Sequence, residues 1–414
     1  MLSGHVHSEF MPMARSLSRL LPRNGEGGAA LCIYHRGECV VDMWAGTRDS
    51  EGRPWEENTI ALSWSTTKGV LSTLLHVLVD RGLAHYDVPV SHYWPEFGQA
   101  EKSKITIRQV LCHEAGLYRI RDMVDDAREM LDWNRMVGAL ERARPSHVPG
   151  ESHGYHGLTY GWLVGELIQR ISGVELSQLV QTELAEPLGL DGLYIGLPQH
   201  ARSRCADVVG AGGGRGLPGL GHESQREAIL KPFRLRRRAQ AARGNPETSD
   251  LDELEAAFLP SGFECFDWNS EVMRSAKIPA LSGFFNARSL ARLYAALACG
   301  GQLDGFRLLS ETTLAEATRV QSRRLGRVIP RPMDWRLGYH RIPVVRAQAP
   351  DAFGHFGIGG SGAWADPARG LAVALILNSG TGTPFGDTRI VRVSSNAVQV
   401  ADARPELARR SSSG

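Results

Sequence analysis

Apolar positions near both ends of the chain follow a pattern typical of β-strands. Residues 29–34 and 39–44 are rich in strand-forming side chains and flank a polar turn at residues 35–38. A second pair of apolar stretches, residues 362–365 and 371–378, is separated by a turn that contains Pro and Gly. Each pair predicts a β-hairpin, so we expect strands to come from both ends of the chain.

Apolar residues in the middle of the chain recur instead at helical spacing. One run stops at Arg81 and Gly82, and residues 158–171 and 289–297 show the same period. The apolar positions of the first run are Val70, Leu71, Leu74, Leu75 and Leu78. Strands at both ends with helices between them predict an α+β fold, in which an antiparallel sheet built from both termini is flanked by helices.

This pattern predicts two domains. Residues 1–85 and 275–414 would together form an α/β domain that contains the antiparallel sheet. Residues 86–274 would form an inserted, mainly helical domain with a loop-rich insertion at about 205–260. A catalytic cleft is then expected between the two parts.

The loop-rich insertion has an unusual composition. Its Gly-rich segment, residues 210–221, lacks the G-x-x-x-x-G-K-[ST] pattern of a phosphate-binding loop. A basic run at residues 234–238 is followed by an acidic group: Glu247, Asp250, Asp252, Glu253 and Glu255. We expect a solvated, partly self-neutralising insertion and no nucleic-acid site. The last residues, 409–414, are expected to form a disordered tail.

Composition excludes several classes of protein. The net charge of +2 gives no reason to expect a nucleic-acid or membrane partner. We see no signal peptide and no apolar run long enough to span a bilayer. The Cys residues are Cys32, Cys39, Cys112, Cys205, Cys265 and Cys299, and they form no C-x-x-C pair. Free buried thiols, no metal site and a cytoplasmic location are therefore expected.

The first indication of a catalytic residue is that Lys is rare in this chain. Only five of the 47 Lys and Arg residues are Lys, and one of them is Lys68 in the tetrad Ser65-Thr66-Thr67-Lys68. Arg stays protonated in proteins, whereas a buried Lys can lose its proton and act as a base. Ser65 precedes a predicted helix, so its side chain would share a helix face with Lys68 and its N–H would be free to bind an oxyanion. The tetrad therefore predicts a nucleophile and its base.

Two further segments carry residue types that fit the same chemistry. Tyr155 follows a Pro-Gly turn at the head of a predicted helix, and a nearby cation would favour its phenolate. His355-Phe356-Gly357 opens a Gly-rich stretch whose backbone could approach a substrate and complete an oxyanion hole.

In order and spacing, the three segments resemble the motifs of the serine β-lactamase and penicillin-binding-protein superfamily, and most of all those of the class C-like family VIII carboxylesterases. Ser65 to Lys68 matches the S-x-x-K motif, Tyr155-His156-Gly157 lies where class C enzymes have Y-x-N, and His355-Phe356-Gly357 lies where they have K-T-G. Residues 111–117 resemble the family segment LLTHTSGL, and residues 335–339 resemble its GLGW segment.

The resemblance implies a β-lactamase-like fold, a serine mechanism and no cofactor. Ser65 would attack an acyl carbonyl, Lys68 and Tyr155 would share the base and acid roles, and the N–H groups of Ser65 and Ile358 would hold the oxyanion. The substrate-binding positions would be Gly157, His355, Phe356 and Gly357. Which of Lys68 and Tyr155 is the primary base stays open.

Two departures from the family pattern change the expected substrate. Gly157 replaces the Asn of Y-x-N, and His355 replaces the Lys of K-T-G, with no Lys after Lys277 to take its place. Loss of that cation weakens the expected recognition of an anionic β-lactam and favours neutral esters. His355 could supply the charge only when protonated, so we expect activity to vary with pH across the range in which His titrates.

We therefore expect a serine carboxylesterase that acts on a small-molecule ester with a short- to medium-chain acyl group. The alternatives are a β-lactamase or D,D-peptidase, an acyltransferase, and a non-catalytic binding member of the fold. An α/β-hydrolase is disfavoured because the sequence around Ser361 lacks the last Gly of G-x-S-x-G. A zincin is disfavoured because no second His follows His113-Glu114 at the required spacing.

Overall fold

The computed structural model describes residues 2–21, 26–210, 251–380 and 388–403. The basic run at 234–238, most of the Gly-rich segment and the tail at 409–414 lie outside these described residues. Glu247 and Asp250 lie outside them as well.

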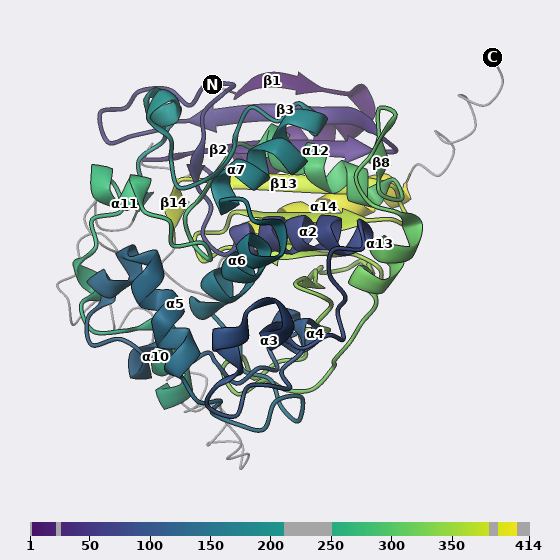
Figure 1. Cartoon of the computed structure of the whole chain (residues 1–414). Helices are drawn as coiled ribbons and strands as arrows, with labels where there is room; N and C mark the ends of the chain where they lie inside the picture. Colours follow the sequence, from purple (N-terminus) through teal and green to yellow (C-terminus); the bar gives the residue numbers. More distant parts are fainter. Residues whose placement is uncertain (1, 22–25, 211–250, 381–387, 404–414) are drawn as a thin grey trace, which may run out of the picture.

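The main sheet joins strands from the two ends of the chain, as predicted (Figure 1). Its seven described strands run in the order β1-β3-β2-β13-β12-β11-β10, and all neighbours are antiparallel. Their bounds are β1 (Leu2–Val6), β2 (Gly28–His35), β3 (Glu38–Gly46), β10 (His340–Arg341), β11 (Phe353–Phe356), β12 (Gly362–Asp366) and β13 (Leu371–Leu377). Strand β1 was not predicted, because its residues 3–5 are exposed at the sheet edge and show no apolar pattern.

Both predicted hairpins are present, and the first has a tighter turn than expected. Strands β2 and β3 are joined by Arg36 and Gly37 alone, with φ values of 54° and 86°. Two successive residues with positive φ are typical of the type I′ turn, whose twist matches that of the flanking strands. The second hairpin pairs β12 with β13 around residues 367–370.

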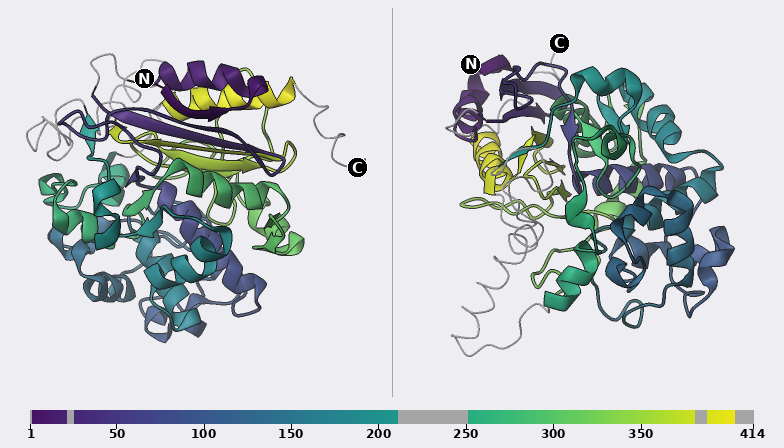
Figure 2. Two further views of the ribbon diagram at one scale, coloured as in Figure 1. Left: turned by 90° about the horizontal axis from the view of Figure 1, so that it is seen from above. Right: turned by 90° about the vertical axis from the view of Figure 1, so that its left-hand side faces the viewer.

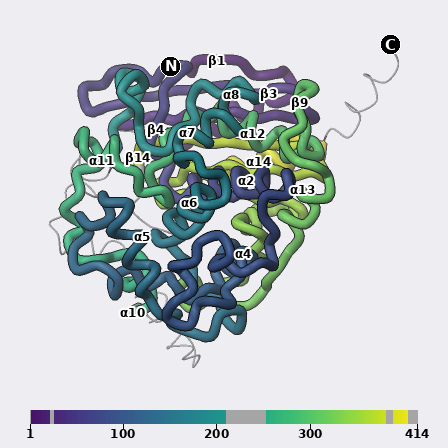
Figure 3. The backbone as a smooth tube through the Cα atoms, in the orientation of Figure 1, coloured from purple at the N-terminus to yellow at the C-terminus, as the bar shows by residue number. Residues whose placement is uncertain are grey.

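The sheet is covered on both faces, which makes its central strands apolar throughout. Leu31 and Ile33 of β2 pack towards helices α1 (Met11–Ser18) and α14 (Thr388–Asp402), whereas Cys32 faces the other side. On that other side lie α12 (Ala287–Ala298) and, beyond it, the rest of the helices (Figure 2). The tube in Figure 3 shows the purple N-terminal strands beside the yellow C-terminal ones.

Three predicted helices are confirmed within one to four residues at each end: α2 (Thr66–Asp80), α6 (Thr159–Ser172) and α12. The other α-helices are α3 (Val90–Tyr93), α4 (Ile107–Leu111), α5 (Trp133–Arg142), α7 (Leu176–Val180), α8 (Glu186–Leu188), α10 (Leu251–Phe258), α11 (Glu271–Ser275) and α13 (Glu311–Thr318). Short 3-10 turns occupy Ser8–Phe10, Pro95–Gly98, Ile120–Asp122, Ala127–Leu131, Gln199–Arg204 and Phe263–Cys265, and Gln181–Ala185 is a π-helical turn. A search of the described helices finds no candidate for a membrane span.

Three small sheets complete the structure that is described. Strands β4 (Ala61–Leu62), β7 (Gly283–Phe285) and β5 (Leu193–Ile195) pair in that order. The other two sheets pair β6 (Val209–Gly210) with β14 (Ser379–Gly380) and β8 (Gln302–Leu303) with β9 (Phe306–Arg307). The domain division at residues 85 and 275 stays a prediction.

All six cysteines lie in the described residues and are free thiols. Cys32, Cys112 and Cys205 are buried as expected, but Cys39 and Cys265 are exposed.

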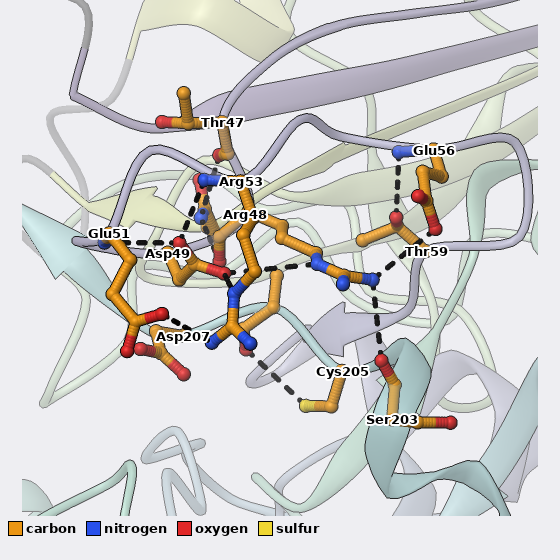
Figure 4. A network of polar contacts seen from close by, with 12 residues as sticks. Thr47, Arg48, Asp49, Glu51, Arg53, Glu56, Thr59, Ser203, Cys205 and Asp207 are labelled. Atoms are coloured by element: carbon orange, nitrogen blue, oxygen red, sulfur yellow. Dashed lines mark hydrogen bonds and ion pairs between the residues drawn. The ribbon is translucent and has the colours of Figure 1, made fainter.

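A polar network fixes the segment that leads into β4 (Figure 4). Asp49 is buried and accepts hydrogen bonds from the backbone N–H of Arg53 at 3.0 Å and from its Nε at 2.6 Å. Arg48 reaches across to Glu56 and to the carbonyl of Ser203, both at 3.3 Å. Burial raises the pKa of Asp49, but the hydrogen bonds from Arg53 and Glu51 together outweigh it and hold the pKa below its usual value.

Replacing this carboxylate should destabilise the protein in a pH-dependent way. We expect Asp49→Asn to lower the free energy of unfolding by about 1.5–3 kcal/mol at pH 7, the usual range for hydrogen bonds to a charged group. Because the folded pKa is depressed, the contribution is complete above the unfolded value of about 3.9 and is lost as pH falls through the folded pKa.

Urea denaturation at pH 7, 5 and 3 measures this difference. Glu51→Gln is the control, since its side chain is 73% exposed and its ion pair with Arg53 should contribute little. An Asp49→Asn deficit that stays constant down to pH 3 would contradict the assignment.

Candidate active site

Ser65 lies in the turn where β4 passes into α2. It is the N-cap residue of α2, but its side chain makes no capping hydrogen bond. The residue before it, Trp64, has a φ of 51°, a left-handed conformation that is unusual for a large side chain. This bend turns the chain sharply between strand and helix, and Ser65 is 7% exposed. Its hydroxyl is therefore available to a neighbour other than its own helix.

That neighbour is Lys68, as the tetrad predicted. Its Nζ lies 2.9 Å from Ser65 Oγ and also donates to the carbonyl of Ala280 at 3.3 Å. The side chain is fully buried, and no carboxylate of the described residues forms an ion pair with it. Burial lowers the pKa of Lys68 well below its usual value. A neutral amine in this position can accept the Ser65 proton.

Tyr155 completes the group, in the loop four residues before α6 and not at the head of the helix as predicted. Its ring centroid lies 5.2 Å from Lys68 Nζ. The expectation that a cation would favour the phenolate is wrong here. Burial raises the pKa of Tyr155, and the nearby Ser65 side chain opposes this increase only in part. The phenol therefore keeps its proton and can donate it.

The turn between β11 and β12 is seated against the nucleophile. Gly357 accepts from the N–H of Gly360 at 3.1 Å and donates its own N–H to Ser361 at 2.7 Å, which closes the turn. A Cβ atom on Gly357 would lie 2.5 Å from the carbonyl oxygen of Ser63, so only Gly fits this approach. Thr66 Oγ1 ties the turn to α2 by donating to Ser361 O at 3.1 Å.

The two predicted oxyanion donors belong to segments that pack together, because Gly357 lies against Ser63, Trp64 and Thr66. Ile358 follows Gly357 directly, and within the described residues neither its N–H nor that of Ser65 has a hydrogen-bond acceptor. Unpaired N–H groups at a helix start and in a Gly-rich turn are the kind of donors that stabilise a developing oxyanion.

The burial of His355 argues against the predicted pH dependence, which required this imidazole to be protonated. It lies on β11, is 2% exposed, and its Nδ1 donates to the carbonyl of Phe356 at 3.2 Å. Burial is the main cause that lowers its pKa well below the usual value. The imidazole therefore stays uncharged across the range in which an exposed His titrates, and it cannot replace the family Lys as a cation.

Of the other two predicted binding residues, Phe356 directs its side chain away from the site and Gly157 lies close to Tyr155. The side chain of Phe356 points to the opposite face of the sheet, where it packs beside Gly362 and Ile390, because successive strand residues alternate. Only its backbone could therefore line the site. Gly157 lies two residues after Tyr155 and directly against the ring of Phe258 from α10.

Sequence reasoning missed several neighbours of Tyr155. Trp335 stacks on its ring at 5.7 Å and 12°, and His113 lies 4.8 Å away with a φ of 61°. His113 Nδ1 accepts the N–H of His156 at 3.1 Å, which holds the loop that carries Tyr155. His113 lies in residues 111–117 and Trp335 in residues 335–339, the two segments that resemble further family segments. The sequence could therefore have indicated that both residues lie near the site. Nothing in the sequence pointed to Phe258, which lies in the segment expected to be solvated.

No group of three or more His, Cys, Asp or Glu side chains in the described ranges is arranged to hold a metal ion. The neighbours of Ser65 are instead an amine, a phenol and backbone donors, a set suited to acyl transfer.

Comparison with known proteins agrees with this chemistry. The family model described as Beta-lactamase matches residues 13–396. The chain is 35% identical over 378 residues to the Esterase/beta-lactamase LipL of Mycobacterium tuberculosis, covering 91% of this chain and 82% of the relative. Among solved structures it is similar to a penicillin-binding protein homolog from Caulobacter crescentus, with 32% identity, a TM-score of 0.81 and coverage of 97% and 100% of the two chains. A family VIII carboxylesterase shows 31% identity, the same TM-score and the same coverage.

The neutral state of His355 can be observed directly. We expect the imidazole ¹⁵N shifts of His355 to stay constant between pH 5 and 8, because burial holds its pKa far below that range. Histidine-selective NMR measures this, with the signal assigned by its loss in His355→Gln. The exposed His5 is a suitable internal control. A midpoint for His355 near pH 6–7 would show that the imidazole carries a charge at the site.

Proposed function

The chain belongs to the Beta-lactamase family, and from this premise we propose that it is a serine carboxylesterase that hydrolyses neutral esters with short- to medium-chain acyl groups. The observation that carries the proposal is the distance of 2.9 Å between Lys68 Nζ and Ser65 Oγ, with the amine fully buried. A relative named esterase/β-lactamase and a similar family VIII carboxylesterase support the ester assignment.

In the proposed acylation, Ser65 Oγ attacks the ester carbonyl carbon while neutral Lys68 takes its proton. The oxyanion that forms is held by the N–H groups of Ser65 and Ile358. The tetrahedral intermediate then expels the alcohol oxygen, which receives the Tyr155 phenol proton. Tyr155 regains a proton from the Lys68 ammonium, so the step ends with a neutral amine, a free alcohol and an acyl group on Ser65.

In the proposed deacylation, water is the nucleophile and Lys68 is again the base. Lys68 takes a proton from the water as its oxygen attacks the acyl carbon, and the same two N–H groups hold the second oxyanion. The bond between the acyl carbon and Ser65 Oγ then breaks as the Lys68 ammonium returns its proton to Oγ, which restores the hydroxyl and the neutral amine and releases the carboxylic acid. The depressed pKa of Lys68 supports its role as the base, and the raised pKa of Tyr155 supports its role as the proton donor.

A neutral ester fits the charges around this site better than an anionic substrate. His355, at the third-motif position, is uncharged, so it gives a substrate carboxylate no ion pair. Lys68 must itself be neutral to act as the base, so it offers no fixed cation either.

The proposed base can be tested with a conservative substitution. We expect Ser65→Ala and Lys68→Arg each to lower kcat/KM for p-nitrophenyl acetate by about 10³-fold or more, because Arg keeps a positive charge but cannot accept a proton. Lys277→Arg is the matched control, since Lys277 is a surface residue paired with Glu175. Activity of Lys68→Arg within a few-fold of the control would overturn the assignment of the base.

The nucleophile is tested separately by intact mass spectrometry after treatment with a serine-reactive phosphonate. Wild type should gain one adduct, and Ser65→Ala should gain none. Equal labelling of the two proteins would remove Ser65 from the mechanism.

A second candidate function is β-lactam hydrolysis, which the name of the Mycobacterium tuberculosis relative favours. We expect a chromogenic cephalosporin to be turned over with a kcat/KM at least about 10²-fold below that of p-nitrophenyl acetate, because the buried His355 does not replace the family Lys as a cation for the β-lactam carboxylate. Side-by-side assays of the two substrates decide this. Comparable values would mean that another residue supplies the charge.

A further inference from the structure

The ring of Phe258 fills the space beside Tyr155 that a side chain at position 157 would need. A Cβ atom built on Gly157 would lie 2.6 Å from Cε1 of the Phe258 ring and 2.9 Å from two further ring atoms. These separations are shorter than any normal carbon–carbon contact, so no side chain fits at position 157 while the ring stays in place. Gly157 is not among the residues with positive φ, so its backbone does not require Gly. The three nearest atoms all belong to this ring, so the ring is the closest steric constraint on position 157.

Phe258 is the last residue of α10, and contacts on two sides of this helix hold it in position. Leu254 and Ala257 are fully buried in the apolar cluster that includes Tyr155 and Trp335. On its other side α10 is tied by ion pairs to the turn at Ile120–Asp122: Arg119 pairs with Asp252 at 3.0 Å and with Glu253 at 2.8 Å. These acidic residues were expected to neutralise the basic run of the insertion, but in the structure they anchor α10 to this turn.

The ring lies next to the group that would protonate the leaving alcohol. The centroids of Phe258 and Tyr155 are 5.8 Å apart, and Phe258 keeps part of its surface exposed. For Tyr155 to donate its proton, the alcohol oxygen must lie within hydrogen-bond distance of the phenol. The carbon chain attached to that oxygen then lies beside Tyr155, where the nearest apolar surface of α10 is the Phe258 ring.

We propose that Phe258 is a specificity-determining residue that forms an apolar wall for the alcohol portion of the ester. This inference rests on the proposed esterase function, and it assigns to α10 the recognition of the leaving group. The wall selects linear, apolar alcohols by contact with the ring, and Gly157 is the glycine that makes room for it.

The first test compares two series of esters with wild type and Phe258→Ala. In one series the acyl group is acetyl and the alcohol is methanol, propanol or hexanol. In the other series the alcohol is p-nitrophenol and the acyl group is acetyl, butyryl or hexanoyl. We expect Phe258→Ala to lower the ratio of kcat/KM for hexyl over methyl acetate about tenfold, and to leave the acyl series within about twofold. Phe306→Ala, at a half-buried Phe on the remote strand β9, is the matched control and should leave both series unchanged.

The outcomes separate the two proposals. If wild type hydrolyses methyl acetate in a Ser65-dependent way but Phe258→Ala leaves the alcohol series unchanged, or changes only the acyl series, the assignment of Phe258 is overturned and the esterase function stands. If wild type shows no Ser65-dependent hydrolysis of any ester, the proposed function itself fails.

The second test asks whether positions 157 and 258 act as one unit. In the wild-type background, Gly157→Ala must displace the ring, so it should lower the hexyl-to-methyl ratio as Phe258→Ala does. In the Phe258→Ala background the added methyl group has space, so Gly157→Ala should have no further effect on the ratio or on the melting temperature. Additive effects of the two substitutions would overturn the inference.

Discussion

An amine moved from water into a protein interior loses its hydration, and the cost falls on the ammonium form. Lys68 is fully buried, and its polar contacts within the described residues are one hydroxyl and one carbonyl, with no carboxylate among them to compensate a charge. The neutral amine is favoured for this reason, and only a neutral amine could accept the proton of Ser65 in the proposed mechanism. The surrounding structure keeps Lys68 buried. Exposure to water would return the pKa of Lys68 to its ordinary value and leave an ammonium that cannot accept a proton. The same burial keeps the Tyr155 phenol protonated and His355 uncharged.

The sheet is what makes such a closed site possible. Pairing of β2 with β13 joins the two ends of the chain, and the turn after β11 then reaches the start of α2. Thr66 and Ser361, which connect the two, are 295 residues apart in the chain. The polar network around Asp49 holds the segment leading into β4, and β4 in turn leads to Ser65 (Figure 4). Ser65 and the turn after β11 are thus held by elements from opposite ends of the sequence.

Around this centre, apolar contacts take positions where charged or polar groups would otherwise meet a substrate. Phe258 fills the space beside Gly157, Trp335 stacks on Tyr155, and His355 is a neutral ring stacked against the same tyrosine. These three rings carry no fixed charge, which supports the proposed neutral ester as substrate.

The sequence by itself determined the features that depend on neighbours close in the chain. The spacing of Ser65 and Lys68 places both on one helix face, and the apolar patterns located both hairpins and the helices α2, α6 and α12. Strand alternation would also have separated His355 from Phe356, although both were assigned to the site. Only the tertiary structure decided that Lys68 is buried, that His355 is neutral, and that Phe258 lies against Gly157. Each of these results from contacts between segments far apart in the chain, and burial and steric fit arise only when those segments pack together.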